Sequence, residues 1–271
     1  MQSAPPPVGA ETRIRQATRS LVRASDILRA LTESDLRFRY GRGPWRLVRW
    51  LLDPVALVGV YLVLVTFVLD LPGTAPGLSL ACAVVPFQLV MMTVANAIDA
   101  IEVRQPILLN MTFKRMLMPV SSALTESVAF GASFLLLIAL MAAYGIGPTW
   151  NLLWLPLLVL VNLVLAIAAA YPAALLGLWL REFKPFLLSF VRTLFFLSPG
   201  LVPLEQTSDR VSNLLRLNPL TGLFESYRDL FLNGTTPAAW QLLYPLAIAL
   251  ILLIAFIPAY RVEQHQFAKV V

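Results

Sequence analysis

The fold is decided by residues 127–180, which read SVAFGASFLLLIALMAAYGIGPTWNLLWLPLLVLVNLVLAIAAAYPAALLGLWL and contain no charged side chain over 54 positions. A transmembrane helix needs about 20 consecutive apolar residues, so this stretch is too long for one helix. Gly145-Ile146-Gly147-Pro148 supplies helix-breaking residues for a turn near its middle. We therefore expect two membrane spans, from about Met118 to Tyr144 and from about Leu152 to Leu180.

The composition of the whole chain agrees with this interpretation. Of 271 residues, 58% are apolar and 13% are charged, and the mean hydropathy is +0.75. Soluble domains are about 45–50% apolar and about 25% charged, so this chain has too little polar surface to cover a soluble globule. The single cysteine, Cys82, excludes a disulfide framework, and the single histidine, His265, excludes a histidine-based metal cluster. The sequence predicts an integral membrane protein.

Four further apolar segments are long enough to be spans. They cover about Pro54–Leu69, Leu78–Ile98, Phe186–Leu204 and Trp240–Tyr260. We therefore expect an all-α membrane protein with six transmembrane helices. Residues 1–50 would form a cytoplasmic leader with amphipathic helices, residues 51–260 the membrane domain, and residues 261–271 a cytoplasmic tail.

The distribution of Lys and Arg predicts the orientation of these spans. With the N-terminus inside, seventeen basic residues lie in the inner segments and three, between Glu205 and Ala239, lie outside. Short inner loops of membrane proteins carry this excess of positive charge. We therefore expect both termini to be cytoplasmic.

The N-terminal segment carries a helical stripe of apolar residues: Ile14, Ala17, Leu21, Ala24, Leu28 and Leu31. Such an amphipathic helix would lie on the inner leaflet, bind a partner protein, or pack against its own membrane domain. A second basic segment follows, from Asp35 to Arg42. Pro44–Trp50 comes next, and its Trp45 and Trp50, together with Arg46 and Arg49, would anchor the chain at the lipid headgroups. The interface helix would include Arg37, Arg39, Trp45 and Trp50.

The outer segment between the last two spans predicts a short helix. Asn218-Pro219 is a favourable helix start, and Asn233-Gly234 is a favourable helix end. Apolar residues from Leu220 to Phe231 form one face, while Glu225 and Arg228 lie on the other side and can pair. The apolar face must be buried in the membrane interface or against other helices.

The fifth expected span is unusual because it contains Arg192 and is broken by Ser198-Pro199-Gly200. An arginine at membrane depth costs about 2.5–3.5 kcal/mol unless it faces water, a partner or a ligand. Arg192 would either pair with Glu126 of the third span or line a transport path. In the second case the nearby Phe195 and Phe196, within one turn of Arg192, would line the same path.

The sequence lacks the motifs that several biochemical activities require. No Gly-Lys pair for an ATP-binding P-loop occurs, because the three lysines follow Phe113, Phe183 and Ala268. The carboxyls of Asp53, Asp99 and Glu126 could form a proton path, although capping and helix pairing are the commoner roles. A proton-coupled secondary transporter or a lipid flippase therefore stays open as an alternative, and a membrane-embedded glycosyltransferase is the weakest.

Several motifs together resemble the membrane subunit of polysaccharide-export ABC transporters. They are Asp35-Leu-Arg-Phe-Arg-Tyr40, Asp53-Pro54, the loop Leu109–Pro119, Leu180-Arg-Glu-Phe183, Leu194-Phe-Phe-Leu-Ser-Pro199 and Asn218-Pro-Leu-Thr-Gly-Leu-Phe-Glu-Ser-Tyr-Arg228. The resemblance covers residues 35–260 and is nearest to actinobacterial permeases that export the lipid-linked galactan of the cell wall. It departs from the family at Lys114, where a proline is usual.

The resemblance implies a homodimer in the bacterial plasma membrane, bound to two copies of a separate ATPase subunit that holds ATP and Mg²⁺. This chain itself would be no enzyme and hold no cofactor. A lipid-pyrophosphate-linked polysaccharide would pass between the two permease chains, and no nucleic acid is involved. The channel residues would be Arg192, Phe195, Phe196, Ser198 and Pro199. The ATPase-coupling loop would include Glu102, Arg104, Phe113, Lys114 and Arg115. The gate helices between spans five and six would include Asn218, Pro219, Phe224, Tyr227 and Arg228, with a partner helix around residues 211–217.

Overall fold

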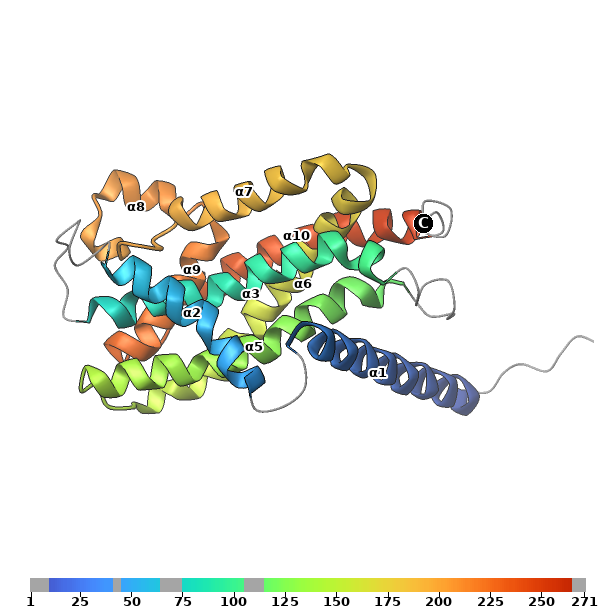
Figure 1. Ribbon diagram of the computed structural model, residues 1–271, viewed down its shortest axis with the longest axis horizontal. Helices are drawn as coiled ribbons and strands as arrows, with labels where there is room; N and C mark the ends of the chain where they lie inside the picture. The colour runs from blue at the N-terminus through green and yellow to red at the C-terminus, as the bar shows by residue number, and fades with distance from the viewer. Residues whose placement is uncertain (1–9, 41–44, 64–74, 105–114, 265–271) are drawn as a thin grey trace, which may run out of the picture.

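A computed structural model of the chain describes residues 10–40, 45–63, 75–104 and 115–264, and the described part is helical without strands (Figure 1). The α-helices are α1 (Ala10–Tyr40), α2 (Trp45–Val63), α3 (Pro76–Val103), α5 (Leu117–Ala143), α6 (Leu155–Trp179), α7 (Lys184–Phe196), α8 (Asp209–Leu215), α9 (Pro219–Arg228) and α10 (Ala239–Glu263). Short 3-10 helices cover Trp150–Trp154, Arg181–Phe183 and Leu204–Gln206, and a π-helical turn, Asp229–Asn233, extends α9.

Four helical segments are long and apolar enough to cross a membrane: Pro76–Val103, Leu117–Ala143, Trp150–Trp179 and Ala239–Glu263. They correspond to the expected second, third, fourth and sixth spans, so an all-helical, multi-pass membrane protein is confirmed. The fourth span starts with a 3-10 turn after Gly147-Pro148, as the turn residues predict. Gly145 adopts the left-handed conformation (φ 69°) that ends α5.

The expected first and fifth spans stay predictions. The described part of α2 ends at Val63, whereas the expected first span continues to Leu69, outside the described residues. α7 ends at Phe196, before Ser198-Pro199-Gly200. Its 13 residues would extend over about 20 Å, which is too short to cross a membrane as one helix.

The N-terminal region forms one helix where the sequence analysis separates two segments. α1 continues through the basic Asp35–Tyr40 segment without a break. The C-terminal part of α1 packs on α5, and Leu31 is buried there. This supports packing on the chain's own membrane domain for that part of the helix.

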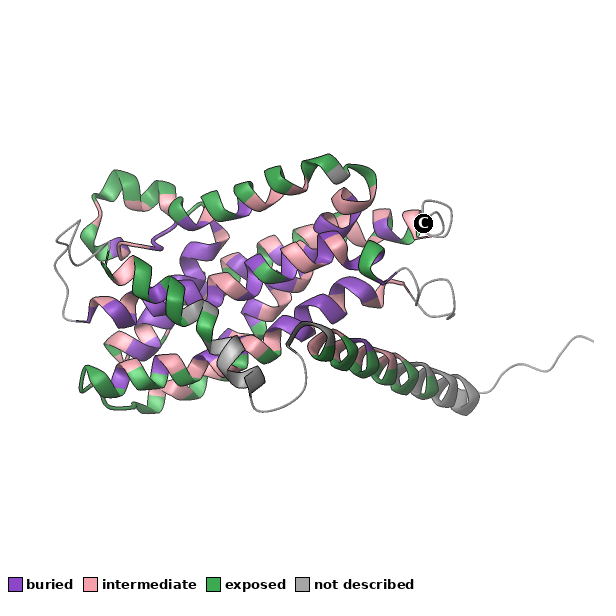
Figure 2. Cartoon of the chain, viewed as in Figure 1, coloured by how far each residue is buried: buried purple, intermediate pink, exposed green. Residues whose placement is uncertain are grey.

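α3 is the central helix of the bundle. It packs against α5, α6, α9, α2 and α7. In its most apolar stretch of 18 residues, 78% of the residues are buried, against 11% in the corresponding stretch of α10. Figure 2 shows this contrast, with buried residues concentrated along α3 and exposed ones along α7 and α8. Small residues line the α3–α6 contact, which lets the two backbones approach closely. Gly177 of α6 lies directly against the backbone of Ile98 of α3. Buried alanines of the two helices include Ala81, Ala97, Ala100, Ala166, Ala170 and Ala174.

Replacing Gly177 with alanine is expected to destabilise the packing of α6 against α3. A Cβ atom at this position would overlap the carbonyl oxygen of Ile98, which is backbone and cannot rotate away. Overpacking costs about 1–3 kcal/mol, which lowers the midpoint of thermal unfolding of the purified protein. Gly131→Ala in α5 is the matched control, because a Cβ there meets no atom within 4 Å. An unchanged midpoint for Gly177→Ala would contradict the close α3–α6 contact.

Hydrogen bonds tie the helix ends together at both ends of the bundle. At one end, the Tyr171 hydroxyl donates to the Met116 carbonyl (3.1 Å), and Lys184 Nζ lies 2.6 Å from both oxygens of Asp99. At the other end, the Gly77 N–H donates to the Tyr144 hydroxyl (3.2 Å), and α8 and α9 lie nearby (Figure 1). By the positive-inside prediction, the first end is cytoplasmic and the second is outer.

Candidate functional site

α7 presents a face that the described part of the chain leaves uncovered. Its inner side packs on α3 and α6, and Val191 and Phe195 are buried there. The opposite side exposes Arg192 and three phenylalanines, of which Phe196 is 56% exposed. The exposed phenylalanines are Phe186, Phe190 and Phe196. A cationic and aromatic face in an apolar protein suits contact with a polar ligand or a second protein surface.

Arg192 and Glu126 are in different environments. The Glu126 side chain is 3% exposed and accepts a hydrogen bond from the side-chain amide of Asn96 on α3. Arg192 is exposed on α7, and among the described residues it makes no ion pair. The structural alternative for Arg192, a buried pair with Glu126, is therefore contradicted.

The two predicted channel phenylalanines also differ. Phe195 is 1% exposed and forms the centre of an aromatic cluster with Tyr61, Phe87 and Phe224, at ring-centroid distances of 5.6, 4.8 and 5.8 Å. Phe196 touches the edge of this cluster and is mostly exposed. Within one chain, Phe195 anchors α7 to α2, α3 and α9, and only Phe196 is available to a ligand.

The break after α7 is closed by side chains from the break itself and from α9. The Ser198 hydroxyl donates to the Phe195 carbonyl (2.7 Å), and Ser198, Pro199 and Gly200 are buried. The Asn218 side-chain amide donates to the carbonyls of Leu194 (2.7 Å) and Leu197 (3.1 Å). These are among the carbonyls that a helix end leaves without partners.

Asn218 also starts α9, as the sequence predicts. Its side-chain oxygen accepts from the Leu220 N–H (3.0 Å), and Pro219 occupies the first turn. The helix ends through its π-helical turn at Gly234, which has φ 63°. Asn218 therefore joins the end of α7 to the beginning of α9.

The polar side of α9 is buried as well as its apolar side. Every residue from Leu220 to Arg228 is buried, so α9 is a core helix and not a half-exposed one. The Glu225–Arg228 pair that the sequence predicts is confirmed, but it lies in the interior: Arg228 Nη1 donates to Glu225 Oε1 at 2.7 Å, and Arg228 is 2% exposed.

Arg228 joins three segments of the chain. Its Nε donates to the Ser79 hydroxyl on α3 (3.0 Å), and its Nη2 donates to the Gly200 carbonyl (3.3 Å). Glu225 in turn accepts from the Leu204 N–H (3.3 Å). Burial raises the pKa of the Glu225 carboxyl above its ordinary value, and the nearby Arg228 guanidinium opposes that shift. These hydrogen bonds connect α9 with α3 and with the segment that follows α7, so the cluster is a structural clamp at the predicted outer end.

The remaining two predicted gate residues are also interior. Phe224 and Tyr227 are 0% exposed, and Tyr227 stacks against Phe231 and Phe134. By contrast, α8 shows Val211 and Leu214 on its surface, and Leu217 just after the helix is exposed as well. α8 is linked to α10 because Arg216 lies 5.2 Å above the Trp240 ring.

The predicted coupling residues separate into different environments. The sequence predicts that Arg104 contacts a partner protein. In the structure Arg104 is 5% exposed and pairs with Asp35 of α1, so its side chain is not available for that contact. Arg115 is partly buried and donates to the Gln264 carbonyl near the end of α10. Glu102 is exposed at the end of α3, and Phe113 and Lys114 lie outside the described residues.

Of the predicted interface-helix residues, only Arg37 has a described side chain. It is exposed and pairs with Glu33 one turn earlier in α1. The side chains of Arg39, Trp45 and Trp50 lie outside the described part of the structure.

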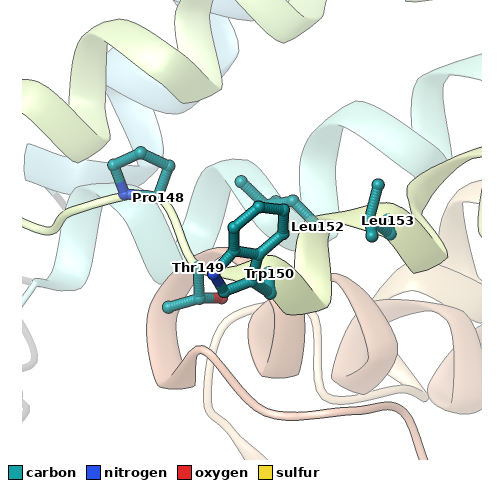
Figure 3. Close-up of a pocket in the computed structure, with 5 residues that line it drawn as sticks. All are labelled: Pro148, Thr149, Trp150, Leu152 and Leu153. Carbon is teal, nitrogen blue, oxygen red and sulfur yellow. The ribbon is translucent and has the colours of Figure 1, made fainter.

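A cavity of about 320 Å³ lies at the outer end, before α6. Pro148, Thr149, Trp150, Leu152 and Leu153 line it (Figure 3). Trp150 is 88% exposed, which is typical of an aromatic residue at the membrane interface. This cavity contains none of the predicted channel residues. The described residues also include no cluster of three His, Cys, Asp or Glu side chains suited to a metal ion.

Sequence reasoning missed the partners that complete these clusters. Ser79, Asn96 and Asp35 lie far along the chain from Arg228, Glu126 and Arg104. A polar residue inside an apolar span was the available signal, since such residues are usually paired. This signal indicates that Ser79 and Asn96 need hydrogen-bond partners, but it does not indicate which residues those partners are.

Comparison with known proteins gives a consistent result. A scan against protein-family models finds no matching family. Among curated proteins, the chain is similar to the O-antigen export system permease protein RfbA of Myxococcus xanthus, with 27% identity over 93% of this chain and 97% of the relative. Two proteins of the same name from Klebsiella pneumoniae are each 22% identical, over 77% and 78% of this chain and 81% and 82% of theirs. The predicted resemblance is thereby confirmed: over most of its length the chain is similar to permease proteins of O-antigen export systems.

Proposed function

We propose that this chain is the permease subunit of an ABC transporter that exports a lipid-linked polysaccharide across the bacterial plasma membrane. ATP hydrolysis would occur in a separate ATPase subunit that holds ATP and Mg²⁺. The observation that carries this proposal is the similarity to an O-antigen export system permease over 93% of this chain and 97% of that relative. A galactan precursor of the cell wall is the glycan that the motif resemblance favours.

The transport path would run along the exposed face of α7. Two permease copies that face each other across α7 would enclose a path lined by Arg192, Phe196 and their counterparts. A guanidinium matches the oxygens of a pyrophosphate in a two-pronged geometry, and phenylalanine rings stack on the apolar faces of sugars. The buried Phe195, Ser198 and Pro199 would hold this face in place instead of touching the glycan.

The burial of α9 changes the proposed arrangement of the gate. Since Arg228 and Asn218 fix α9 to α3 and α7, α9 would be the anchor of the outer region. The exposed α8, with Leu214 at 65% exposure, would be the element that moves when a glycan leaves.

ATPase docking is proposed for the inner end, around the segment between α3 and α5. Glu102, Phe113, Lys114 and Arg115 stay candidates for that surface, while Arg104 is withdrawn because it is buried. Both termini would lie on this cytoplasmic side, as the seventeen inner basic residues favour.

The proton-coupled alternative receives little support from the carboxyl groups. Asp99 pairs with Lys184 at 2.6 Å, and Glu126 accepts a hydrogen bond from Asn96. These are the capping and pairing roles that compete with a proton path.

Co-expression with the ATPase encoded beside the permease gene tests the proposed function. We expect the tagged permease to co-purify with that ATPase. In proteoliposomes, polyprenyl-pyrophosphate-linked polysaccharide from the host membranes should stimulate ATP hydrolysis by the complex and be transported. Transport by the permease alone, driven by a proton gradient, would overturn the proposal in favour of the secondary transporter.

A further inference from the structure

A largely buried ion pair, with Arg104 buried and Asp35 half-buried, connects α1 to the bundle at its predicted cytoplasmic end. Arg104 Nη2 donates to Asp35 Oδ2, and the two side chains are 5% and 16% exposed. The Thr125 hydroxyl of α5 donates to the Ser121 carbonyl (2.9 Å) and lies 3.4 Å from the same carboxylate oxygen. Asp35 of α1 is therefore bound by Arg104 at the end of α3 and lies beside α5.

Arg104 also connects the end of α3 with the start of α5. It is the residue after the last turn of α3, and its Nη1 donates to the Met118 carbonyl at the start of α5 (3.2 Å). One guanidinium thus binds both flanks of this segment and the carboxylate of α1. No other described ion pair links α1 to the rest of the structure.

Few other contacts hold α1. Leu31 is its one buried side chain among those described, and the described side chains nearer its N-terminus, such as Val22 at 54%, are largely exposed. Figure 1 shows α1 diverging from α5 toward its N-terminus. The direction of a 31-residue helix therefore depends on contacts near Leu31 and Asp35.

The surroundings favour a positioning role for this pair over a purely stabilising one. A buried ion pair contributes little net stability, because desolvation of both charges offsets their attraction, and it is better at specifying one geometry. Here the specified geometry is that of α1 relative to both flanks of the segment at which we propose ATPase docking.

We propose that Asp35 is a positioning residue for energy coupling: through Arg104 it fastens α1 to the end of α3 and the start of α5, so that these two helix ends and α1 move as one unit during transport. This inference deepens the proposed function and rests on it. It assigns α1 a mechanical role beside any contact of its basic face with lipid.

The matched pair of variants is Asp35→Ala and Glu33→Ala. Both remove a carboxylate from the same helix within one turn, but Glu33 is exposed and pairs only with the exposed Arg37 of α1. The first measurement needs no ATPase. Spin labels are placed at Val22→Cys on α1 and Val128→Cys on α5, which are both exposed, while Cys82 is buried and stays unlabelled.

In the full-length permease in lipid nanodiscs, we expect a narrow distance distribution between the two labels. Asp35→Ala should broaden it, Glu33→Ala should leave it unchanged, and the exchanged pair Asp35→Arg with Arg104→Asp should narrow it again. An unchanged distribution in Asp35→Ala would overturn the inference whatever the protein transports.

The second measurement is the amount of polysaccharide exported per ATP hydrolysed by the permease–ATPase complex in proteoliposomes. Asp35→Ala should lower this ratio by about tenfold, within the range of couplings between distant sites, while ATPase binding is retained. Glu33→Ala should match the unmodified protein. An unchanged ratio despite a broadened distance distribution would refute the coupling role. Failure of the unmodified complex to export would instead refute the proposed function.

Discussion

Permease with Arg192→Ala is expected to fold and bind its ATPase normally and to lose export by about a hundredfold or more. The fold should survive because Arg192 is exposed on α7, and Glu126 already has a polar partner in Asn96. Export should fail because two charge-assisted hydrogen bonds to a pyrophosphate, at about 1.5–3 kcal/mol each, disappear from the transport path. At 1.4 kcal/mol per factor of ten, their loss amounts to roughly a hundredfold or more.

Two further variants make the Arg192 prediction specific. Arg192→Lys keeps the charge but loses the two-pronged geometry, so export should lie between the two extremes. Arg29→Ala removes an exposed arginine from α1 and should leave export unchanged. Export is measured as glycan delivered into inverted membrane vesicles, and folding as thermal stability of the purified complex. Loss of stability together with export in Arg192→Ala would show that the residue is structural, and unchanged export would remove it from the transport path.

Arg228→Met should unfold the outer region, with the largest stability loss of any substitution considered. It removes hydrogen bonds to Ser79, Gly200 and Glu225 and leaves the Glu225 carboxyl buried without its cation. Removing one partner of a buried ion pair costs about 3–5 kcal/mol. We expect a clearly lower midpoint of thermal unfolding and a loss of the monodisperse species in detergent.

The double variant Glu225→Gln with Arg228→Met should recover part of that loss, because the amide carries no charge to leave unpaired. Arg210→Met on α8 is the control, since Arg210 is exposed and surface substitutions usually change stability by less than about 0.5 kcal/mol. Equal stability of the Arg228→Met and Arg210→Met proteins would contradict the clamp at α9.

Local sequence signals predicted the helices of this protein well, and predicted the environment of single side chains poorly. Apolar length located four spans within a few residues, and Asn218-Pro219 and Asn233-Gly234 located the ends of the α9 segment. The same methods placed Arg104 on a docking surface and the polar side of α9 in a half-exposed position. Both errors arise because a charged residue near a helix end has the same local pattern whether it faces water or a distant partner.

The fifth expected span shows the limit of length as a signal. The segment Phe186–Leu204 is apolar enough for a span, but Ser198-Pro199-Gly200 ends α7 at Phe196. The sequence predicts that break, yet it cannot say where the freed carbonyls find partners. Asn218 supplies them from 24 residues further along the chain.

By itself, the sequence determined the membrane environment, the helical class and the helix ends, and its motifs identified the relatives. These properties depend on the composition and order of neighbouring residues, because apolar length and local backbone hydrogen bonding decide which segments form helices in a membrane. Tertiary structure alone decided that α9 is buried on both sides, that Phe195 is an anchor while Phe196 is exposed, and that Arg104 binds Asp35 of α1. The environment of each of these side chains depends on which distant helix supplies the opposite charge or the neighbouring ring. The packing of the helices around α3 decides which helix that is.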